Sequence, residues 1–361
     1  MFWNKEDPTH YEDKVHDFAD TAIMFDHIFT TDADCLKRYK RDYGHTSIHL
    51  LMFATQPKLF NPIEKYVRTD DVVFAGSWYN NFKDRAEEMG KAFDLVINCG
   101  YNLKIYNRQS NSNDPNFNFP KKYRKYLHSS LQHEQLDEAH KGSNYALNFN
   151  TVKESPTIFA RRVFELMCSN TLIITNNSDG VKRMFGDKAV YFENSKNLDL
   201  SHADDKKLAC LYTVLRYHTY TSRFNKILDV VGLSYQTRPS EVLLVYRAST
   251  LMEAKKSIEN FNLVNWSSKK AIIVLPDDIK PEDLNTIFIK LYSRRVHVTL
   301  EKDLNALVKS GGSYYIADVA PDMPANFIPD ALLHYSYIDK NVAIVYDEKE
   351  VSPFAFENFS D

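Results

Sequence analysis

Apolar and polar positions follow one another in a pattern that predicts alternating helices and strands. Apolar residues recur at helical spacing from Tyr11 to Ala22, whereas Leu172 to Ile174 form an apolar run typical of strands covered on both faces. The same criteria predict helices over 11–22, 32–39, 83–92 and near 181, helical segments up to 140, and strands over 26–30, 48–53, 72–76, 95–97, 145–149 and 172–175.

A second alternating pattern follows in the C-terminal third. Helical spacing dominates residues 200–232, and strands and helices alternate again from Val242. Strands are predicted at 242–246, 271–275, 296–299, 314–317 and 342–346, with helices at 252–261 and 282–291. Strands separated by helices favour doubly wound parallel sheets, so the sequence predicts an α/β fold.

Breaks in this pattern divide the chain into four parts. Residues 54–62 contain two prolines and no regular spacing, as expected of a hinge between domains. We therefore expect a first part over 1–62, an α/β domain over 63–200, a helical connector over 201–238 and a second α/β domain over 239–361.

Charge and cysteine content exclude several classes of protein. A formal net charge of −3 gives no sign of a nucleic-acid partner. The four cysteines lie far apart without CxxC spacing, which favours structural thiols in a reduced, cytoplasmic protein. No apolar run is long enough to cross a bilayer, so we expect peripheral contact with a membrane at most.

Glycine is scarce, and this narrows the choice of nucleotide-binding classes. The 361 residues include 10 glycines, well below the usual share of about 7%. Neither GxGxxG nor GxxxxGK[ST] occurs. The sequence therefore argues against a dinucleotide-dependent dehydrogenase and against a P-loop NTPase.

The most informative segment is SPTIFARRVFELMCSNTLIIT, residues 155–175. Ser155 is a natural N-cap for a helix that carries Arg161, Arg162 and Glu165. A helix N-terminus with nearby arginines attracts phosphate, and a carboxylate two turns in suits the paired hydroxyls of a sugar. This combination predicts a nucleotide-sugar site. Alternatively, Arg161 and Glu165 pair at i,i+4 on a solvated helix face.

Polar and small residues follow three of the predicted strands. They are Gly76-Ser77, Asn150-Thr151 and Asn176. Ligands of doubly wound sheets bind outside the carboxyl ends of the strands. We therefore expect these residues to face the same site as the arginines.

Two acidic pairs have spacings found in metal sites. Asp32-Ala33-Asp34 has DxD spacing but opens a predicted helix, where acids favour the helix dipole. Asp277-Asp278 follows a strand end, where a turn explains it equally well. We expect a donor site without metal, since guanidinium groups and a helix N-terminus can stabilise a leaving diphosphate, and we expect no cofactor.

Four separated motifs resemble those of the spore-maturation-protein B-like glycosyltransferases, in the same order. They are WNKEDP (3–8), FDHIFTTD (25–32), FAGSWYNNFKDR (74–85) and SPTIFARRVFE (155–165), and they span roughly residues 1–195. That family belongs to the glycosyltransferase group 1 clan, whose GT-B fold has two Rossmann-like domains. The resemblance implies that 63–200 is the nucleotide-sugar-binding domain and that 1–62 is a remnant of the first domain.

The resemblance also implies roles for individual residues. Gly76 and Ser77 would approach the diphosphate, with Arg85 adding charge nearby. Arg161 or Arg162 would neutralise diphosphate oxygens, and Glu165 would hold the ribose hydroxyls. The clan often has another glutamate eight residues before this one, where the present chain has Thr157.

The start of the chain departs from the family pattern. Met1 is followed almost at once by a motif that normally lies late in the first domain. The resemblance therefore implies that most of the acceptor-binding domain is missing. The chain would then be a fragment, half of a split enzyme, or a protein that another polypeptide completes. The candidate acid/base residues near the hinge are Glu6, Asp7 and His10, each of which could instead cap the helix that starts at Tyr11.

Residues 240–350 resemble the opening of a family-two, GT-A-type transferase domain. VLLVYRAS resembles its first strand, and YYIADVAPDMPANFIPDALLHY resembles the region of its metal-binding acids. Asp318 and Asp322 occupy comparable ground, but no compact DxD is present. We expect a degenerate, non-catalytic GT-A-like domain.

Three functions remain open at this point. The first is a glycosyltransferase that moves a hexose from a nucleotide-diphosphate sugar to a glycan or polyol acceptor of a cell-surface or spore polysaccharide. The second is a non-catalytic subunit or pseudo-enzyme that binds a protein partner. The third is a teichoic-acid-type phosphotransferase, which would use the same anion-binding features.

Overall fold

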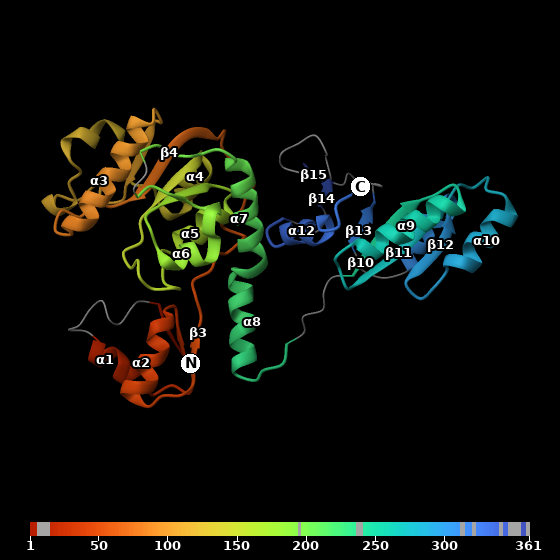
Figure 1. Cartoon of the computed structure of the whole chain (residues 1–361), viewed down its shortest axis with the longest axis horizontal. Coiled ribbons are helices and arrows are strands. Elements are labelled where there is room, and N and C mark those ends of the chain that lie inside the picture. Colours follow the sequence, from red (N-terminus) through yellow and green to blue (C-terminus); the bar gives the residue numbers. More distant parts are fainter. Residues whose placement is uncertain are drawn as a thin grey trace. The chain divides into compact units, whose positions relative to one another are not determined.

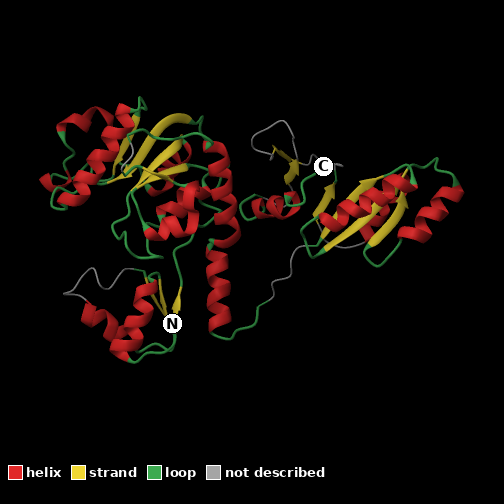
Figure 2. Ribbon diagram, viewed as in Figure 1, coloured by secondary structure: helices red, strands yellow, loops and turns green. Residues whose placement is uncertain are grey.

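The computed structural model describes residues 1–5, 15–193, 196–235, 241–310, 315–319, 323–338, 342–345 and 355–358. The chain forms two compact units, Met1–Ser234 and Tyr235–Asp361. Each unit contains a parallel sheet with helices against it (Figures 1 and 2).

The first unit begins with a small parallel sheet. Strands β1 (Phe2–Asn4), β2 (Ile28–Thr30) and β3 (Ile48–Leu50) lie in that order, each paired in parallel with the next. Helices α1 (Val15–Ala22) and α2 (Ala33–Tyr43) contribute to its core. We refer to residues 1–62 as the N-terminal lobe.

The main sheet of this unit has six parallel strands in the order β6-β5-β4-β7-β8-β9. Their bounds are β4 Thr69–Gly76, β5 Leu103–Asn107, β6 Leu127–His128, β7 Ser143–Asn148, β8 Leu172–Thr175 and β9 Val190–Tyr191. The chain moves outward from β4 in one direction and from β7 in the other. The predicted α/β, Rossmann-like fold class is confirmed, and its topological switch point lies between β4 and β7.

Helices cover both faces of this sheet (Figure 1). Helix α3 (Lys83–Asn98) buries Met89, Phe93 and Val96 against one face. Helices α4 (Leu136–Lys141), α5 (Arg162–Cys168) and α7 (Ala203–Tyr217) contact strands on the other face. Because both faces are covered, β8 is buried along its whole length, and Val72, Val73 and Phe74 of β4 are buried as well.

The strand predicted at 95–97 is wrong. These residues form the last turns of α3, which runs for 16 residues to Asn98. Met89, Phe93 and Val96 are spaced at i, i+4 and i+7 and are fully buried, so the apolar run continues a helical stripe. The next strand is β5, eight residues later than predicted.

The helix predicted to start at Ser155 is also wrong at its N-terminus. Helix α5 begins at Arg162, and residues 155–161 form turns and irregular backbone. Ser155 accepts hydrogen bonds from the backbone N–H groups of Thr157 and Ile158, so its oxygen organises a local turn. Pro156 therefore does not stand at the first position of a helix.

The remaining elements complete the first unit. They are α6 (Asp179–Phe185), α8 (Tyr220–Val230) and the short 3₁₀ helices Pro115–Phe117, Lys121–Tyr126, His133–Gln135 and Gly186–Lys188. Hydrogen bonds between the backbones of Thr55, His218 and Tyr220 join the hinge to the start of α8.

The second unit has a four-stranded parallel sheet in the order β12-β11-β10-β13. The strands are β10 Val242–Arg247, β11 Lys269–Leu275, β12 Val296–Leu300 and β13 Tyr315–Asp318. Its helices are α9 Leu251–Leu263, α10 Pro281–Leu291, α11 Leu304–Ser310 and α12 Phe327–His334, with a 3₁₀ turn at Glu301–Asp303. Strands β14 (Val342–Val345) and β15 (Ala355–Asn358) pair antiparallel.

Candidate functional site

The carboxyl ends of neighbouring strands bring polar residues together in the first unit. Ser77 follows β4, Arg108 follows β5, Asn150 follows β7 and Asn176 follows β8. Three of these positions were expected from the sequence to lie at strand ends. Because β5, β4, β7 and β8 are adjacent in the sheet, the side chains share one edge at the switch point.

Arg108 links two of these strand ends. Its backbone N–H donates to the carbonyl oxygen of Gly76 at 3.0 Å, and its Nε donates to Ser77 Oγ at 3.2 Å. Its Nη2 donates to the hydroxyl of Tyr79 at 2.9 Å. Ser77 is buried, so Arg108 is fixed over the end of β4.

Arg85, in the first turn of α3, lies at the same edge. Its Nη1 donates to Thr151 Oγ1 at 2.7 Å, and its guanidinium carbon lies 5.7 Å from the ring centre of Tyr79. Its Nε is buried and has no hydrogen-bond acceptor within the described part of the chain. Such an unpaired buried donor is costly unless a ligand or water completes it.

Helix α5 contributes Arg161, Arg162 and Glu165. Arg161 Nε and Glu165 Oε1 form an i,i+4 ion pair at 2.7 Å, with the arginine half exposed and the carboxylate nearly buried. The ion pair between Arg161 and Glu165, which the sequence offered as the alternative to a ligand site, is therefore present. The side chain of Arg162 makes no hydrogen bond with any residue that the structure describes.

The pKa of Arg162 shows how these charges gather. Burial lowers it, the carboxylate of Glu165 acts in the opposite sense, and the positive charges of Arg108, Arg85 and Arg161 lower it further. Arg162 therefore lies close enough to the other three guanidinium groups to be repelled by them, and Arg85 is likewise repelled by Arg108. We call Arg85, Arg108, Arg161 and Arg162 the arginine cluster.

Asn150 supports this site without facing it. Its backbone N–H and its Nδ2 both donate to Asn176 Oδ1, at 2.8 and 3.1 Å, and its Oδ1 accepts from the backbone N–H of Ala160 at 2.9 Å. Asn176 Nδ2 also donates to Glu88 Oε2 at 3.0 Å. These buried bonds use the polar atoms of Asn150 within the chain and fix the segment that leads to α5.

Ser155 contacts the N-terminal lobe. Its hydroxyl donates to Asp32 Oδ1 at 2.7 Å. Thr157, at the position of the clan's additional glutamate, donates to the carbonyl oxygen of Thr31 at 2.9 Å and accepts from the N–H of Ala33 at 2.8 Å.

Gly76 has a packing reason for lacking a side chain. A Cβ atom at this position would lie 2.5 Å from the tip of the Phe74 ring. The small residue at the end of β4 therefore makes room for an aromatic ring of the core. Ser77 and Arg108 are the groups that reach the sheet edge here.

The acidic candidates have mixed outcomes. Glu6, Asp7 and His10 lie outside the described residues. Asp32 caps α2 by accepting from the N–H of Asp34, as the helix-cap alternative expected. Among the described residues, no group of three metal-ligating side chains lies together.

Each unit has a pocket beside its parallel sheet. One of about 550 Å³ lies beside α3 in the first unit and is lined by Asp84, Glu87, Glu88, Lys91, Leu95, Lys153, Phe192 and Glu193. Burial, and a hydrogen bond with Glu193, raise the pKa of Glu88, while its 3.1 Å contact with Lys153 Nζ opposes this.

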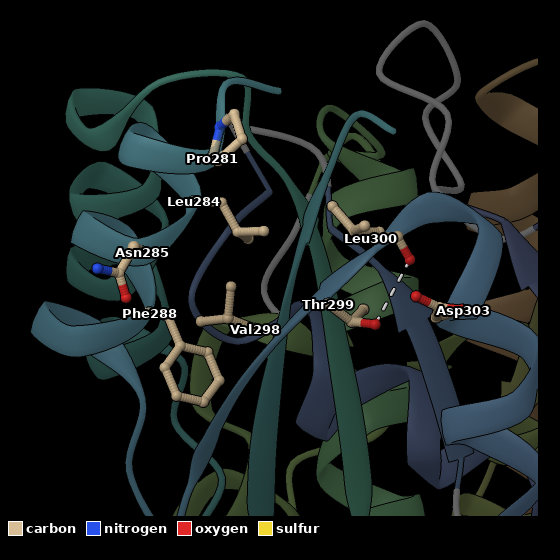
Figure 3. Close-up of a pocket in the computed structure, with 8 residues that line it drawn as sticks. All are labelled: Pro281, Leu284, Asn285, Phe288, Val298, Thr299, Leu300 and Asp303. Carbon is tan, nitrogen blue, oxygen red and sulfur yellow. Dashed lines mark hydrogen bonds between the residues drawn. The ribbon is translucent and has the colours of Figure 1, made fainter. Parts of the chain in front are cut away.

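The other pocket, of about 380 Å³, lies between α10 and β12 in the second unit (Figure 3). It is lined by Pro281, Leu284, Asn285, Phe288, Val298, Thr299, Leu300 and Asp303. Its lining is mixed: Leu284, Phe288 and Val298 are apolar, and Asn285, Thr299 and Asp303 add polar groups. Asp277 lies outside this lining and accepts from the N–H of Lys302 at 3.1 Å, as expected of a turn residue.

The sequence analysis missed Arg108 and Tyr79, whereas Thr151, which accepts from Arg85, was among the expected strand-end residues. Arg108 was missed because the strand before it was predicted eight residues too early. The apolar positions of Leu103-Lys-Ile-Tyr-Asn107 carried the correct signal, and a strand there makes Arg108 a strand-end residue.

Comparison with known proteins supports the glycosyltransferase part of the resemblance. Residues 68–229, under half of the chain, match the family model described as glycosyl transferase-like. No match was found among curated proteins. The matched region contains the arginine cluster and Glu165. The spore-maturation-protein B-like assignment and the GT-A-like segment stay predictions.

Several solved structures are similar at low identity. One is a mutant of S. aureus TarM in complex with Fondaparinux, alpha-GlcNAc-glycerol and UDP, at 11% identity over 60% of this chain and 46% of that chain, with a TM-score of 0.40. The GtfA/B complex is 13% identical over 60% of this chain and 48% of that chain, with a TM-score of 0.39. TarM is 11% identical over 60% of this chain and 45% of that chain, with a TM-score of 0.37. The chain spans less than half the length of each, and similarity at this level assigns no function.

Among the helices that the structure describes, none combines the length and the apolar character that a bilayer span requires.

Proposed function

We propose that the first unit binds the donor of a glycosyltransferase, a nucleotide-diphosphate sugar, and that the chain transfers its hexose to a cell-surface or spore polysaccharide. The arginine cluster would bind the diphosphate and Glu165 the ribose hydroxyls. The glycosyl transferase-like match over residues 68–229 supports the class of reaction.

One observation carries this proposal. Four guanidinium groups gather at the carboxyl edge of the sheet, at its switch point, and two of them keep unused donors there. Arg85 has a buried Nε without an acceptor among the described residues, and Arg162 makes no hydrogen bond to them. Mutual repulsion of these charges is unfavourable in the free protein, and a diphosphate would relieve it.

The chemistry of glycosyl transfer fits such a cluster. As the bond between the sugar and the diphosphate breaks, negative charge grows on the leaving oxygens. Guanidinium groups that are already in place stabilise this charge without reorganisation. We therefore propose a donor site that needs no divalent cation.

The proposed reaction also needs an acceptor and a second polypeptide. The acceptor would be a glycan or a polyol, and a partner polypeptide would complete the acceptor-binding side. Cys35, Cys99, Cys168 and Cys210 form no disulfide, which agrees with action in the reducing cytoplasm.

Titration of the full chain with UDP, GDP and their sugars tests the donor site. We expect one nucleotide to bind and Arg162→Ala to weaken it more than tenfold, since a charged hydrogen bond is lost. Arg216→Ala, on the exposed side of α7, is the matched control and should bind normally. Absence of binding by every nucleotide would count against the site.

Product analysis separates the alternatives. Release of free nucleotide together with a glycosylated product supports sugar transfer, whereas a product that carries glycerol phosphate supports the phosphotransferase. Binding without turnover, even with partner proteins from the native cell, would support the non-catalytic subunit.

A further inference from the structure

The loop between β7 and α5 is joined to the N-terminal lobe by a small hydrogen-bonded contact. Ser155 Oγ donates to Asp32 Oδ1 at 2.7 Å, although the two residues are 123 positions apart. Thr157 adds two further bonds, to the carbonyl oxygen of Thr31 and from the N–H of Ala33. We call these three bonds the lobe–loop contact.

The lobe–loop contact is shielded from water. Asp32 is 2% exposed and Ser155 is 4% exposed. Asp32 Oδ1 also accepts from the N–H of Asp34 at 3.1 Å, and Oδ2 accepts from Cys35 Sγ at 3.4 Å. A buried carboxylate with several donors holds its neighbours strongly, because no water can replace them.

The same loop leads directly into the arginine cluster. Its far end is fixed where the N–H of Ala160 donates to Asn150 Oδ1 at 2.9 Å. Arg161 follows at once, and α5 begins with Arg162. The loop is therefore held at two points, Asp32 near its middle and Asn150 near its end, just before the residues that would bind the donor.

We propose that Asp32 is a positioning residue of the donor site, which acts through Ser155 and the loop on Arg161, Arg162 and Glu165. This inference rests on the proposed function. It also gives the DxD-spaced Asp32 a role other than metal binding. The Thr157 hydroxyl forms two of the three bonds of the lobe–loop contact. The position where the clan often has a glutamate therefore holds the loop to the N-terminal lobe in this chain.

A consequence is that the N-terminal lobe and donor binding are coupled. If the contact holds the loop in its binding form, loss of the contact lowers donor affinity, and by linkage the bound donor stabilises the contact.

The experiment compares Asp32→Ala, Asp32→Asn, Ser155→Ala and the double variant Asp32→Ala/Ser155→Ala in the full chain. Affinity for UDP and GDP is measured by calorimetry, and amide hydrogen exchange is followed over residues 156–161. Ser155→Ala leaves the bond from Asp34 N–H to Asp32, and thus the cap of α2, intact. It also removes the acceptor of the Thr157 and Ile158 N–H groups, so the two single variants are compared with each other. Asp34→Ala is the matched control, an exposed acid of the same motif.

We expect Asp32→Ala and Ser155→Ala each to weaken nucleotide binding about tenfold, as loss of a charged hydrogen bond implies. The double variant should lose less than the sum of the two single losses, because both changes remove the bond between Ser155 and Asp32. Exchange over 156–161 should become faster in all three. Asp32→Asn keeps an acceptor for Ser155 and should stay near the unmodified chain, as should Asp34→Ala.

Each other result overturns the inference. Normal affinity in Ser155→Ala, with nucleotide bound by the unmodified chain, removes the positioning role but leaves the proposed function intact. A metal role would give a different result. Both Asp32→Ala and Asp34→Ala would then bind nucleotide more weakly than the unmodified chain in Mg²⁺ and equally well without it, which assigns the pair to a metal instead. If the unmodified chain binds neither nucleotide, the proposed function fails and the positioning role fails with it.

Discussion

At the scale of single residues, the proposed donor site depends on arginines that keep unused donors within the described part of the chain. Arg108 donates to Ser77 and Tyr79, and Arg85 donates to Thr151, whereas the Arg162 side chain has no hydrogen-bond acceptor among the described residues. Glu165 is the carboxylate of α5 beside this cluster, and one of its oxygens is bonded to Arg161.

Glu165→Ala should weaken nucleotide binding well beyond tenfold, because a nearly buried charged acceptor of the ribose hydroxyls is lost. Thermal stability should change little, since the partner Arg161 is half exposed and such pairs contribute about 0–1 kcal/mol. Asp42→Ala breaks the i,i+4 pair with Arg38 on α2 and serves as control. Calorimetry checks both variants. Unchanged affinity in Glu165→Ala would remove this residue from the site.

At the scale of elements, the sequence predicts regular segments well and misses what distant residues decide. Strand β8 has the predicted bounds, because its apolar run is buried on both faces. Helix α5 starts six residues later than predicted, since the hydroxyl of Ser155 bonds to Asp32 in the N-terminal lobe. Local patterns carry no sign of such a partner. Arg108 was missed because a helical stripe in α3 was taken for the next strand.

The junction of α7 and α8 gives a pH-dependent prediction. His218 stacks on Phe164 with ring centres 5.0 Å apart, and Arg223 Nη2 donates to its Nδ1 at 2.8 Å. An arginine always donates, so this ring nitrogen is unprotonated. Burial, and secondly the charge of Arg223, lower the pKa of His218 to about 4.

The sign follows from linkage. An unfolded histidine has a pKa near 6.5, so the unfolded chain binds this proton first as the pH falls. The stability contributed by neutral His218 is therefore complete above about pH 6.5 and is lost as the pH falls through about 4, a difference of about 3 kcal/mol. Urea unfolding at several pH values should show a shallower acid dependence in His218→Phe. Equal slopes in the two proteins would contradict this reading.

At the scale of the whole molecule, every described residue of the proposed donor site lies in the first unit. The unit ends at Ser234, and the sheet, the arginine cluster and the lobe–loop contact all belong to it. The second unit has its own parallel sheet and its own core, which includes Leu243, Val245 and Ile272. The α/β class of both units follows from the alternation of segments in the sequence.

A chain that ends at Ser234 should therefore fold and bind nucleotide like the full chain. Circular dichroism and cooperative thermal unfolding check the fold, and calorimetry checks the affinity. The full chain with Phe288→Ser in the second unit, at the wall of the α10–β12 pocket, is a control that should also bind normally. A truncated chain that folds but binds much more weakly would place part of the donor site beyond Ser234.

The most direct measurement is titration of the full chain with UDP and with GDP, once in EDTA and once in Mg²⁺. Our account predicts that one nucleotide binds equally well in both, and that Arg85→Ala and Arg162→Ala each weaken it more than tenfold. Binding that requires Mg²⁺, or that both arginine variants leave unchanged, would contradict the claim that guanidinium groups hold the donor diphosphate.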